Sequence, residues 1–172
     1  MATHVGHNWK HDKNDKQRFF DNMTREDIEA KCQKEIFRMG GSCILRDESK
    51  ELQKGKQATA PDAYINGILT DIRSITESTE YYTNQLKAKN SQLGRWNRQN
   101  PNETANTVTL YFHEPSWLSM EKLGKSIERL KYMHKIDPET KEYIDEYIHI
   151  NFDKVLIVLN GADRIIEYDV AK

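Results

Sequence analysis

The dipeptide Asn66-Gly67 lies between two short apolar runs and constrains the fold more than any other feature of the chain. Asn-Gly in this setting predicts a two-residue β-hairpin, because a type I′ turn needs positive φ at both central residues. In that register Asp62 lies opposite Asp71, with β-carbons about 4.5–5.5 Å apart. Side chains alternate along a strand, so Arg73 shares the face of the two carboxylates. The sequence therefore predicts a like-charge pair beside an arginine.

Two carboxylates placed directly opposite each other destabilise a sheet. Three things can offset the repulsion: the guanidinium of Arg73, a bound cation, or a proton shared by the pair. The alternative is a surface cluster with no role, since charged clusters are usually solvated. What surrounds the pair decides between a site and an exposed patch.

Other elements are expected on both sides of this hairpin. Thr24 is expected to cap a helix that ends at Gly40-Gly41, with apolar residues on one face. Asp137-Pro138 has the pattern of an N-cap followed by proline at the first helical position. The further expected elements are a strand at 43–45, a loop at 46–60, a helix capped by Ser78 or Thr79 and running over 80–97, a strand at 106–113, a helix beginning at Pro115 or Ser119, and a short helix after Asp137-Pro138 with Tyr143, Ile144, Tyr147 and Ile148 on one face.

The chain closes with a second expected hairpin, formed by 154–159 and 162–169 around Asn160-Gly161. This order of elements predicts one α/β (α+β) domain, with a mixed central sheet, two Asn-Gly hairpins and flanking helices. The domain is expected over residues 23–172, and residues 1–22 are expected to form an N-terminal extension. A length of 172 residues fits a single domain.

Composition limits the classes of protein only coarsely. The net charge is −1, so any phosphate-binding surface must be a local patch. No apolar run reaches the roughly 18 residues of a membrane span, and the N-terminus lacks the apolar segment of a signal peptide. Two cysteines, Cys32 and Cys43, do not make a disulfide framework. We expect a cytoplasmic protein with no membrane partner.

The pattern Pro61-Asp62, then eight residues, then Asp71-Ile72-Arg73 resembles the PD-(D/E)XK motif of restriction-like nucleases. The segment PDAYINGILTDIRSIT is also similar to a hairpin in the C-terminal nuclease domains of bacterial contact-dependent inhibition toxins. The resemblance implies a toxin-like or restriction-like nuclease that cleaves phosphodiester bonds of RNA or DNA. It implies nucleic acid as a partner and raises a cognate inhibitor protein as a second one.

The same resemblance implies Mg²⁺ as a cofactor. Asp62 and Asp71 would be its oxygen ligands, a ligand type that Mg²⁺ prefers. In these families an N-terminal helix often supplies a glutamate. Between the two candidates there, we prefer Glu35 to Glu29, because Glu35 lies nearer the edge of the expected apolar face.

One position departs from the motif, because Arg73 stands where the family has lysine. Arginine can stabilise transition-state charge but cannot release a proton near neutral pH. The lysine is then expected elsewhere, or the mechanism is metal-free and His113 moves the proton. The lysine candidates in the preceding loop are Lys50, Lys54 and Lys56. The predicted catalytic residues are Asp62, Asp71, Arg73 and His113.

The helix expected over 80–97 carries candidates for nucleic-acid binding. Residues 80–98 hold four basic side chains and one acidic side chain, in a chain that is nearly neutral overall. Basic side chains interleaved with aromatic ones suit phosphate contact and base stacking. The alternative is an ordinary amphipathic helix with a basic outer face. The candidates are Lys87, Lys89, Arg95, Trp96 and Arg98.

Two functions therefore stay open. The first is a nuclease, and the second is a non-catalytic module that binds nucleic acid or protein on a nuclease-like fold, for example a phage or mobile-element accessory protein. The lysine-to-arginine change is what the second function predicts. A third carboxylate at an open cleft would favour the enzyme, and packed side chains over the pair would favour the module.

Overall fold

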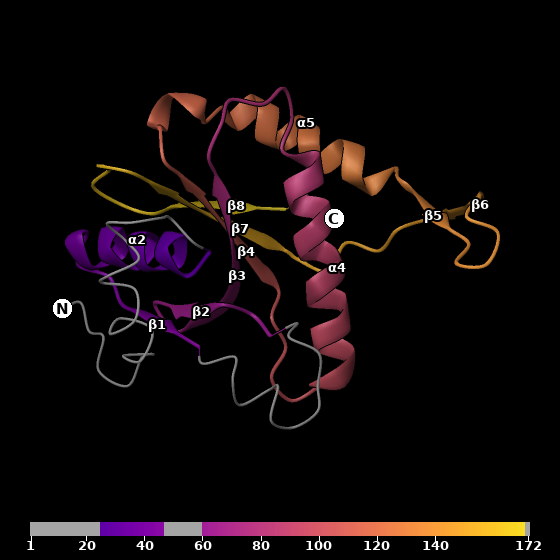
Figure 1. Cartoon of the computed structure of the whole chain (residues 1–172), viewed down its shortest axis with the longest axis horizontal. Coiled ribbons are helices and arrows are strands. Elements are labelled where there is room, and N and C mark those ends of the chain that lie inside the picture. Colours follow the sequence, from indigo (N-terminus) through magenta and orange to yellow (C-terminus); the bar gives the residue numbers. More distant parts are fainter. Residues whose placement is uncertain (1–24, 47–59, 171–172) are drawn as a thin grey trace.

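The computed structural model describes residues 25–46 and 60–170, with the backbone alone for 25–27. A mixed six-stranded sheet runs through its centre in the order β1-β2-β3-β4-β7-β8 (Figure 1). The β3, β4 and β7 strands are parallel, and the other pairs are antiparallel. The strands are β1 Cys43–Leu45, β2 Ala63–Ile65, β3 Ile68–Ile75, β4 Thr107–Phe112, β7 Lys154–Leu159 and β8 Ile166–Asp169.

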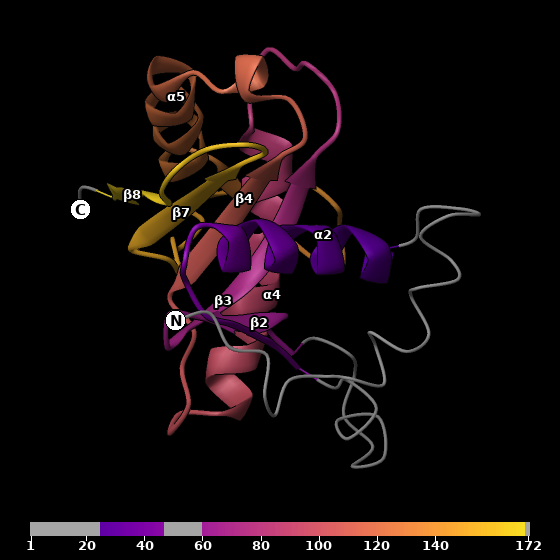
Figure 2. The same cartoon turned by 90° about the vertical axis from the view of Figure 1, so that its left-hand side faces the viewer.

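Helices cover both faces of this sheet (Figure 2). Helix α2 (Arg25–Arg38) lies on one face, where Cys32 and Ile36 are buried. Helices α4 (Thr83–Gln99) and α5 (Met120–Lys131) share the core on the other face, and a short 3₁₀ helix, Pro115–Trp117, precedes α5. The protein is thus a single mixed α/β domain, as expected. Of the helices in the described ranges, none is long and apolar enough to cross a membrane.

The first Asn-Gly hairpin forms in the expected register. Ile65 pairs with Ile68, and Ala63 pairs with Thr70. Both turn residues have positive φ, 48° at Asn66 and 82° at Gly67, which is the backbone that a type I′ turn requires. The prediction for β2 and β3 is therefore confirmed, and it places Asp62 and Asp71 next in register beyond the last pair.

Helix α4 begins later than the sequence predicts. Its N-cap is Tyr82, and no side chain caps it. The backbone N–H of Tyr82 donates instead to the hydroxyl of Ser126, at 2.9 Å, which belongs to α5. A tertiary contact has taken the place of the local cap that Ser78 or Thr79 was expected to provide.

The prediction of a helix after Asp137-Pro138 is wrong, because this segment is part of a two-stranded arm. Its strands are β5 His134–Ile136 and β6 Tyr143–Tyr147. Asp137 does cap backbone N–H groups, but those of Glu139 and Thr140 in the turn between the strands, at 2.8 and 3.3 Å. The arm projects from the end of α5 away from the sheet (Figure 1).

The second Asn-Gly hairpin is only partly as expected. The turn at Asn160-Gly161 forms, since Ala162 N–H donates to the carbonyl of Leu159 at 3.1 Å. The strand does not resume there, however, and Ile157 pairs with Ile166 in a register two residues wider than a tight hairpin. The expected strand over 162–169 therefore shortens to β8. The expected extension over residues 1–22 lies outside the described residues.

Candidate active site

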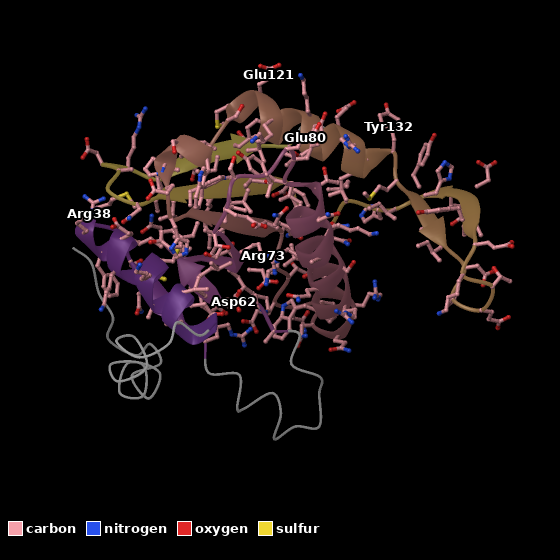
Figure 3. All side chains as sticks on the ribbon, turned by 45° about the horizontal axis from the view of Figure 1, so that its top comes forward. Arg38, Asp62, Arg73, Glu80, Glu121 and Tyr132 are labelled. Carbon is pink, nitrogen blue, oxygen red and sulfur yellow. The ribbon has the colours of Figure 1, made fainter. Side chains whose placement is uncertain are left out.

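Asp62 and Asp71 meet where β2 and β3 separate. Ala63–Thr70 is the last backbone pair of the two strands. Beyond it, Asp62 Oδ2 accepts a hydrogen bond from the backbone N–H of Ile72, at 2.7 Å. A side-chain oxygen thus stands in for the next carbonyl of the ladder, and the strands open around the carboxylates. Figure 3 shows Asp62 and Arg73 in the region between α2 and α4.

Lys89, from α4, supplies the positive charge at this point. Its Nζ lies 3.3 Å from Asp71 Oδ1 and 3.8 Å from Asp62 Oδ2. The three side chains belong to residues that are only 1–3% exposed, so the contacts are shielded from solvent. The sequence predicted Lys89 on a nucleic-acid-binding surface, but the structure places it inside a buried charge cluster. A signal was present: Lys89 is three residues after Leu86 and four before Leu93, which places it on the apolar face of α4.

The third carboxyl group of the cluster comes from Glu29 of α2, which forms a side-chain hydrogen bond with Asp62. The contacts of the described residues do not bring Glu35, the preferred candidate, to the pair: Glu35 Oε2 binds the Nε of Arg38 at 2.8 Å, within the same helix. Glu29 and Glu35 are six residues apart and point to different sides of α2. Which side faces the carboxylates depends on how α2 crosses the sheet, and the helical period alone does not contain that information.

The environment separates the pKa values of the two aspartates. Burial, together with the negative charge of Asp62, raises the pKa of Asp71 well above its ordinary value. Burial also acts to raise the pKa of Asp62, but the Asp71 carboxyl, Lys89, Glu29 and the Ile72 N–H stabilise its charge and lower its pKa overall. At pH values near the ordinary pKa of a carboxyl group, the pair therefore holds one proton, and that proton is on Asp71.

The donor set of the cluster has the chemistry of a site for a hard divalent cation. Glu29, Asp62 and Asp71 offer carboxylate oxygens, which Mg²⁺ prefers. Both side-chain oxygens of Asp71 are buried without a well-formed hydrogen bond from a described residue. Within the described ranges, no three acidic, histidine or cysteine side chains already have the spacing of a metal site. The residues fit the ion in kind, and the site would have to close around it.

Arg73 does not offset the carboxylate pair. Its side chain is exposed, and it forms no ion pair or hydrogen bond with the described part of the chain. Arg73 was one candidate to offset the repulsion between Asp62 and Asp71. In the structure Lys89 and the shared proton offset it instead. The loop lysines Lys50, Lys54 and Lys56 lie outside the described residues.

His113 lies apart from the carboxylates. Its Nε2 is 2.6 Å from the hydroxyl of Ser74, and its ring contacts that of Tyr111, with centroids 4.7 Å apart. Ser74 is three residues from Asp71 on β3, which places the two side chains on opposite faces of the sheet. Burial and the charge of Lys31 lower the pKa of His113. The structure therefore does not bring this predicted proton carrier to the pair.

Trp96 is also in the wrong place for its predicted role. It is 2% exposed, and its Nε1 donates to the carbonyl of Glu103 at 2.7 Å. The guanidinium of Arg46 lies over its ring, 4.7 Å from the centroid. A base cannot stack on an indole covered in this way. The members of the predicted nucleic-acid set that remain exposed are Lys87, Arg95 and Arg98.

The carboxylates line neither of two surface cavities in the described part of the chain. One cavity, of about 240 Å³, lies beside Asn66 and Ile165. The other, of about 600 Å³, lies beside Tyr81 and Tyr132. Of the two conditions that would favour an enzyme, the third carboxylate is present, whereas the described residues show no open cleft at the pair.

The comparisons with known proteins add no relative to these observations. A scan against protein-family models found no match, and no curated protein and no solved structure is similar enough to the chain to count as one.

Proposed function

We propose that the chain is a nuclease that cleaves phosphodiester bonds of RNA or DNA, with Mg²⁺ held by Asp62, Asp71 and Glu29. The observation that carries the proposal is the convergence of three carboxyl groups, from α2, β3 and the residue before β2, with one lysine from α4. Buried charge clusters are often no more stabilising than apolar side chains of the same size. Strongly shifted pKa values in such clusters are typical of functional sites.

The resemblance to PD-(D/E)XK nucleases supports the same proposal. The family has two acidic groups on paired strands and a glutamate from a preceding helix; here Asp62 directly precedes β2, Asp71 lies on the paired strand β3, and Glu29 comes from α2. The motif's third position is Arg73, but Lys89 brings an ammonium group to Asp71 from α4. The departure in the sequence is thereby offset by a residue from another element.

The residues of the cluster have distinct roles in this mechanism. Bound Mg²⁺ would polarise the phosphate and lower the pKa of an attacking water. Asp71 must first release its proton, which makes the second carboxylate available. With the charge of the two carboxylates neutralised by Mg²⁺, the ammonium of Lys89 would then be available to stabilise negative charge on a phosphate oxygen. Arg73, exposed two residues further along β3, would contact the substrate backbone.

Access to the cluster requires a conformational change. Asp62, Asp71 and Lys89 are 3% exposed or less, so a phosphate cannot reach them in the conformation described. Closing and opening of sites by segment motion is common in enzymes and often limits their rate. A toxin-like role and a cognate inhibitor protein follow from the resemblance, whereas a cytoplasmic location is expected from the composition, and all three belong to the same proposal.

Cleavage of labelled single-stranded RNA, single-stranded DNA and duplex DNA tests the proposal directly. We expect cleavage of at least one substrate with Mg²⁺ or Mn²⁺ and none with EDTA. Asp71→Asn and Lys89→Met should each lose activity, while Lys141→Met, a change at an exposed lysine between β5 and β6, should retain it. Absence of cleavage of all three substrates with either ion would refute the nuclease.

The burial of the cluster favours one second candidate, a module that binds nucleic acid without cleaving it. Lys87, Arg95 and Arg98 are exposed on α4 and would contact phosphates, while the buried charges would serve the fold alone. Salt-sensitive binding by a protein that cleaves nothing would identify this function. Binding to no nucleic acid at low salt would exclude it as well.

A further inference from the structure

The arm formed by β5 and β6 carries most of the large apolar side chains that the described residues expose. Tyr143 is 75% exposed, Tyr147 53% and Ile136 47%, and Tyr132 at the root of the arm is 61% exposed. Among the strands of residues 25–46 and 60–170, these two pair only with each other. Isolated two-stranded hairpins are marginally stable in water and usually need a third strand or a helix to cover them. The arm therefore lacks a covering surface within the described chain.

The exposed side chains gather on one face of the arm. Register pairs His134 with Tyr147 and Ile136 with Tyr143, and cross-strand partners share a face. Tyr147 also contacts the rings of Tyr132 and His134, with centroids 5.6 and 4.9 Å apart. We call Tyr132, His134, Ile136, Tyr143 and Tyr147 the aromatic face. Tyrosine-rich patches of this kind are typical of protein–protein interfaces.

Charge on the arm excludes one class of partner. Residues 134–147 contain five acidic side chains and two lysines. Such a surface repels a phosphate backbone, so the aromatic face is not a platform for nucleic-acid bases. On the opposite face Lys135 pairs with Glu146 at 3.1 Å. Asp145 lies between Tyr143 and Tyr147 along β6, at the register shift between the two strands; it is exposed and has no ion-pair partner among the described residues.

A complementary surface begins at the root of the arm. The cavity of about 600 Å³ on the outer side of α5 is lined by Tyr81, Lys125, Glu128, Arg129, Tyr132 and Met133. Tyr132 belongs to both this cavity and the aromatic face, and Figure 3 shows it where α5 leads into the arm. Lys125 is paired with Glu121, but the guanidinium of Arg129 contacts only the ring of Tyr81, at 4.2 Å, within the described part of the chain. The molecule thus presents an unpaired arginine in an aromatic cavity beside an unpaired aspartate on an aromatic arm.

We propose that a second copy of this chain covers this surface, with the aromatic face of each arm over the α5 cavity of the other copy and Asp145 of one copy paired with Arg129 of the other. One face of such a short hairpin covers only part of the roughly 800 Å² that each partner of a standard interface buries. A reciprocal exchange doubles the contact, because each copy contributes one arm and one cavity. The two contacts are related by a two-fold axis, so the assembly closes as a dimer.

Analytical ultracentrifugation of the full chain over about 1–100 µM tests the dimer, with charge reversal as the probe. The wild type should dimerise, and Asp145→Arg and Arg129→Glu should each raise the dissociation constant about tenfold or more. The double variant, which restores opposite charges, should return the constant to within about threefold of the wild type. Glu146→Arg is the matched control, since it makes the same change one residue away on the opposite face.

Three results would overturn the proposal. A wild type that is monomeric at about 100 µM has no such interface. A dimer that neither single reversal weakens is held by another surface. A double variant no tighter than the single ones, in proteins whose circular dichroism is unchanged, shows that the two residues do not meet. The arm is exposed, so these variants are expected to fold.

Discussion

Lys89 Nζ lies 3.3 Å from Asp71 Oδ1, and the two residues are 3% and 1% exposed. The contact joins α4 to β3 inside the protein, where the loss of Lys89 would leave the buried carboxylates without a cation. Stability and the proposed chemistry therefore depend on the same contact, and variants at these positions must be measured for both.

Lys89→Met should lower the free energy of unfolding by roughly 3–5 kcal/mol, because it leaves the buried Asp62 and Asp71 without a cation. Methionine fills a similar volume, so the loss reports charge rather than a cavity. Urea denaturation measures it. Lys87→Met, exposed on the same helix, should change the free energy by less than about 0.5 kcal/mol. Equal stability of the two variants would show that the cluster is open to water.

Asp71→Asn should change how stability depends on pH. Burial and Asp62 raise the pKa of Asp71 in the folded state, so its stabilising contribution is complete below the unfolded value of about 3.9 and is lost as pH rises through the folded pKa. Asparagine resembles the protonated form and does not titrate. We expect equal melting temperatures at low pH and a variant more stable at pH 8, by about 1 kcal/mol or roughly 2–4 °C. If the melting temperature of the wild type rose relative to that of the variant with increasing pH, the raised pKa of Asp71 would be contradicted.

The double variant Lys87→Glu/Arg95→Glu should weaken nucleic-acid binding and its dependence on salt. Each phosphate contact contributes about 0.7–0.9 to the slope of log K against log salt, so losing two should flatten the slope by about 1.5. Fluorescence anisotropy at several salt concentrations measures this. The control is Lys141→Glu/Lys154→Glu, which makes the same change in net charge in the turn between β5 and β6 and at the start of β7. Identical slopes for both variants would remove α4 from the interface.

His113→Gln should keep Mg²⁺-dependent cleavage within about threefold of the wild type, since His113 and Asp71 lie on different faces of the sheet. A general acid or base contributes roughly 10²–10⁴-fold to a rate. A loss of that size in the variant, together with activity that survives EDTA, would support the metal-free mechanism instead. Single-turnover cleavage rates distinguish the two.

The sequence predicted best where structure depends on neighbouring residues. Asn66-Gly67 determines the hairpin through its own backbone, so the approach of Asp62 and Asp71 followed from it. The predicted short helix was wrong because Tyr143, Ile144, Tyr147 and Ile148 fit one face of a helix and are also strong strand formers. Periodicity alone does not decide between the two over so short a segment.

Only half of the candidate site could be predicted from the sequence. Its β-strand residues were found, whereas Glu29 and Lys89 depend on how α2 and α4 pack against the sheet. A lysine among apolar residues at helical spacing has two interpretations, an interruption of the apolar face or a buried charge. Only a partner elsewhere in the chain decides between them, and that partner is 18 residues away on β3.

The hydrogen bond from Ile72 N–H to Asp62 Oδ2 gives the two aspartates unequal freedom to change. Asp62 completes the edge of a strand as well as carrying charge, whereas Asp71 accepts no backbone hydrogen bond from a described residue. A lineage that abandons the chemistry can therefore replace Asp71 at once and even gain stability. Replacement of Asp62 has to wait for a repair of the sheet, so the fold preserves half of the site after its use has ended.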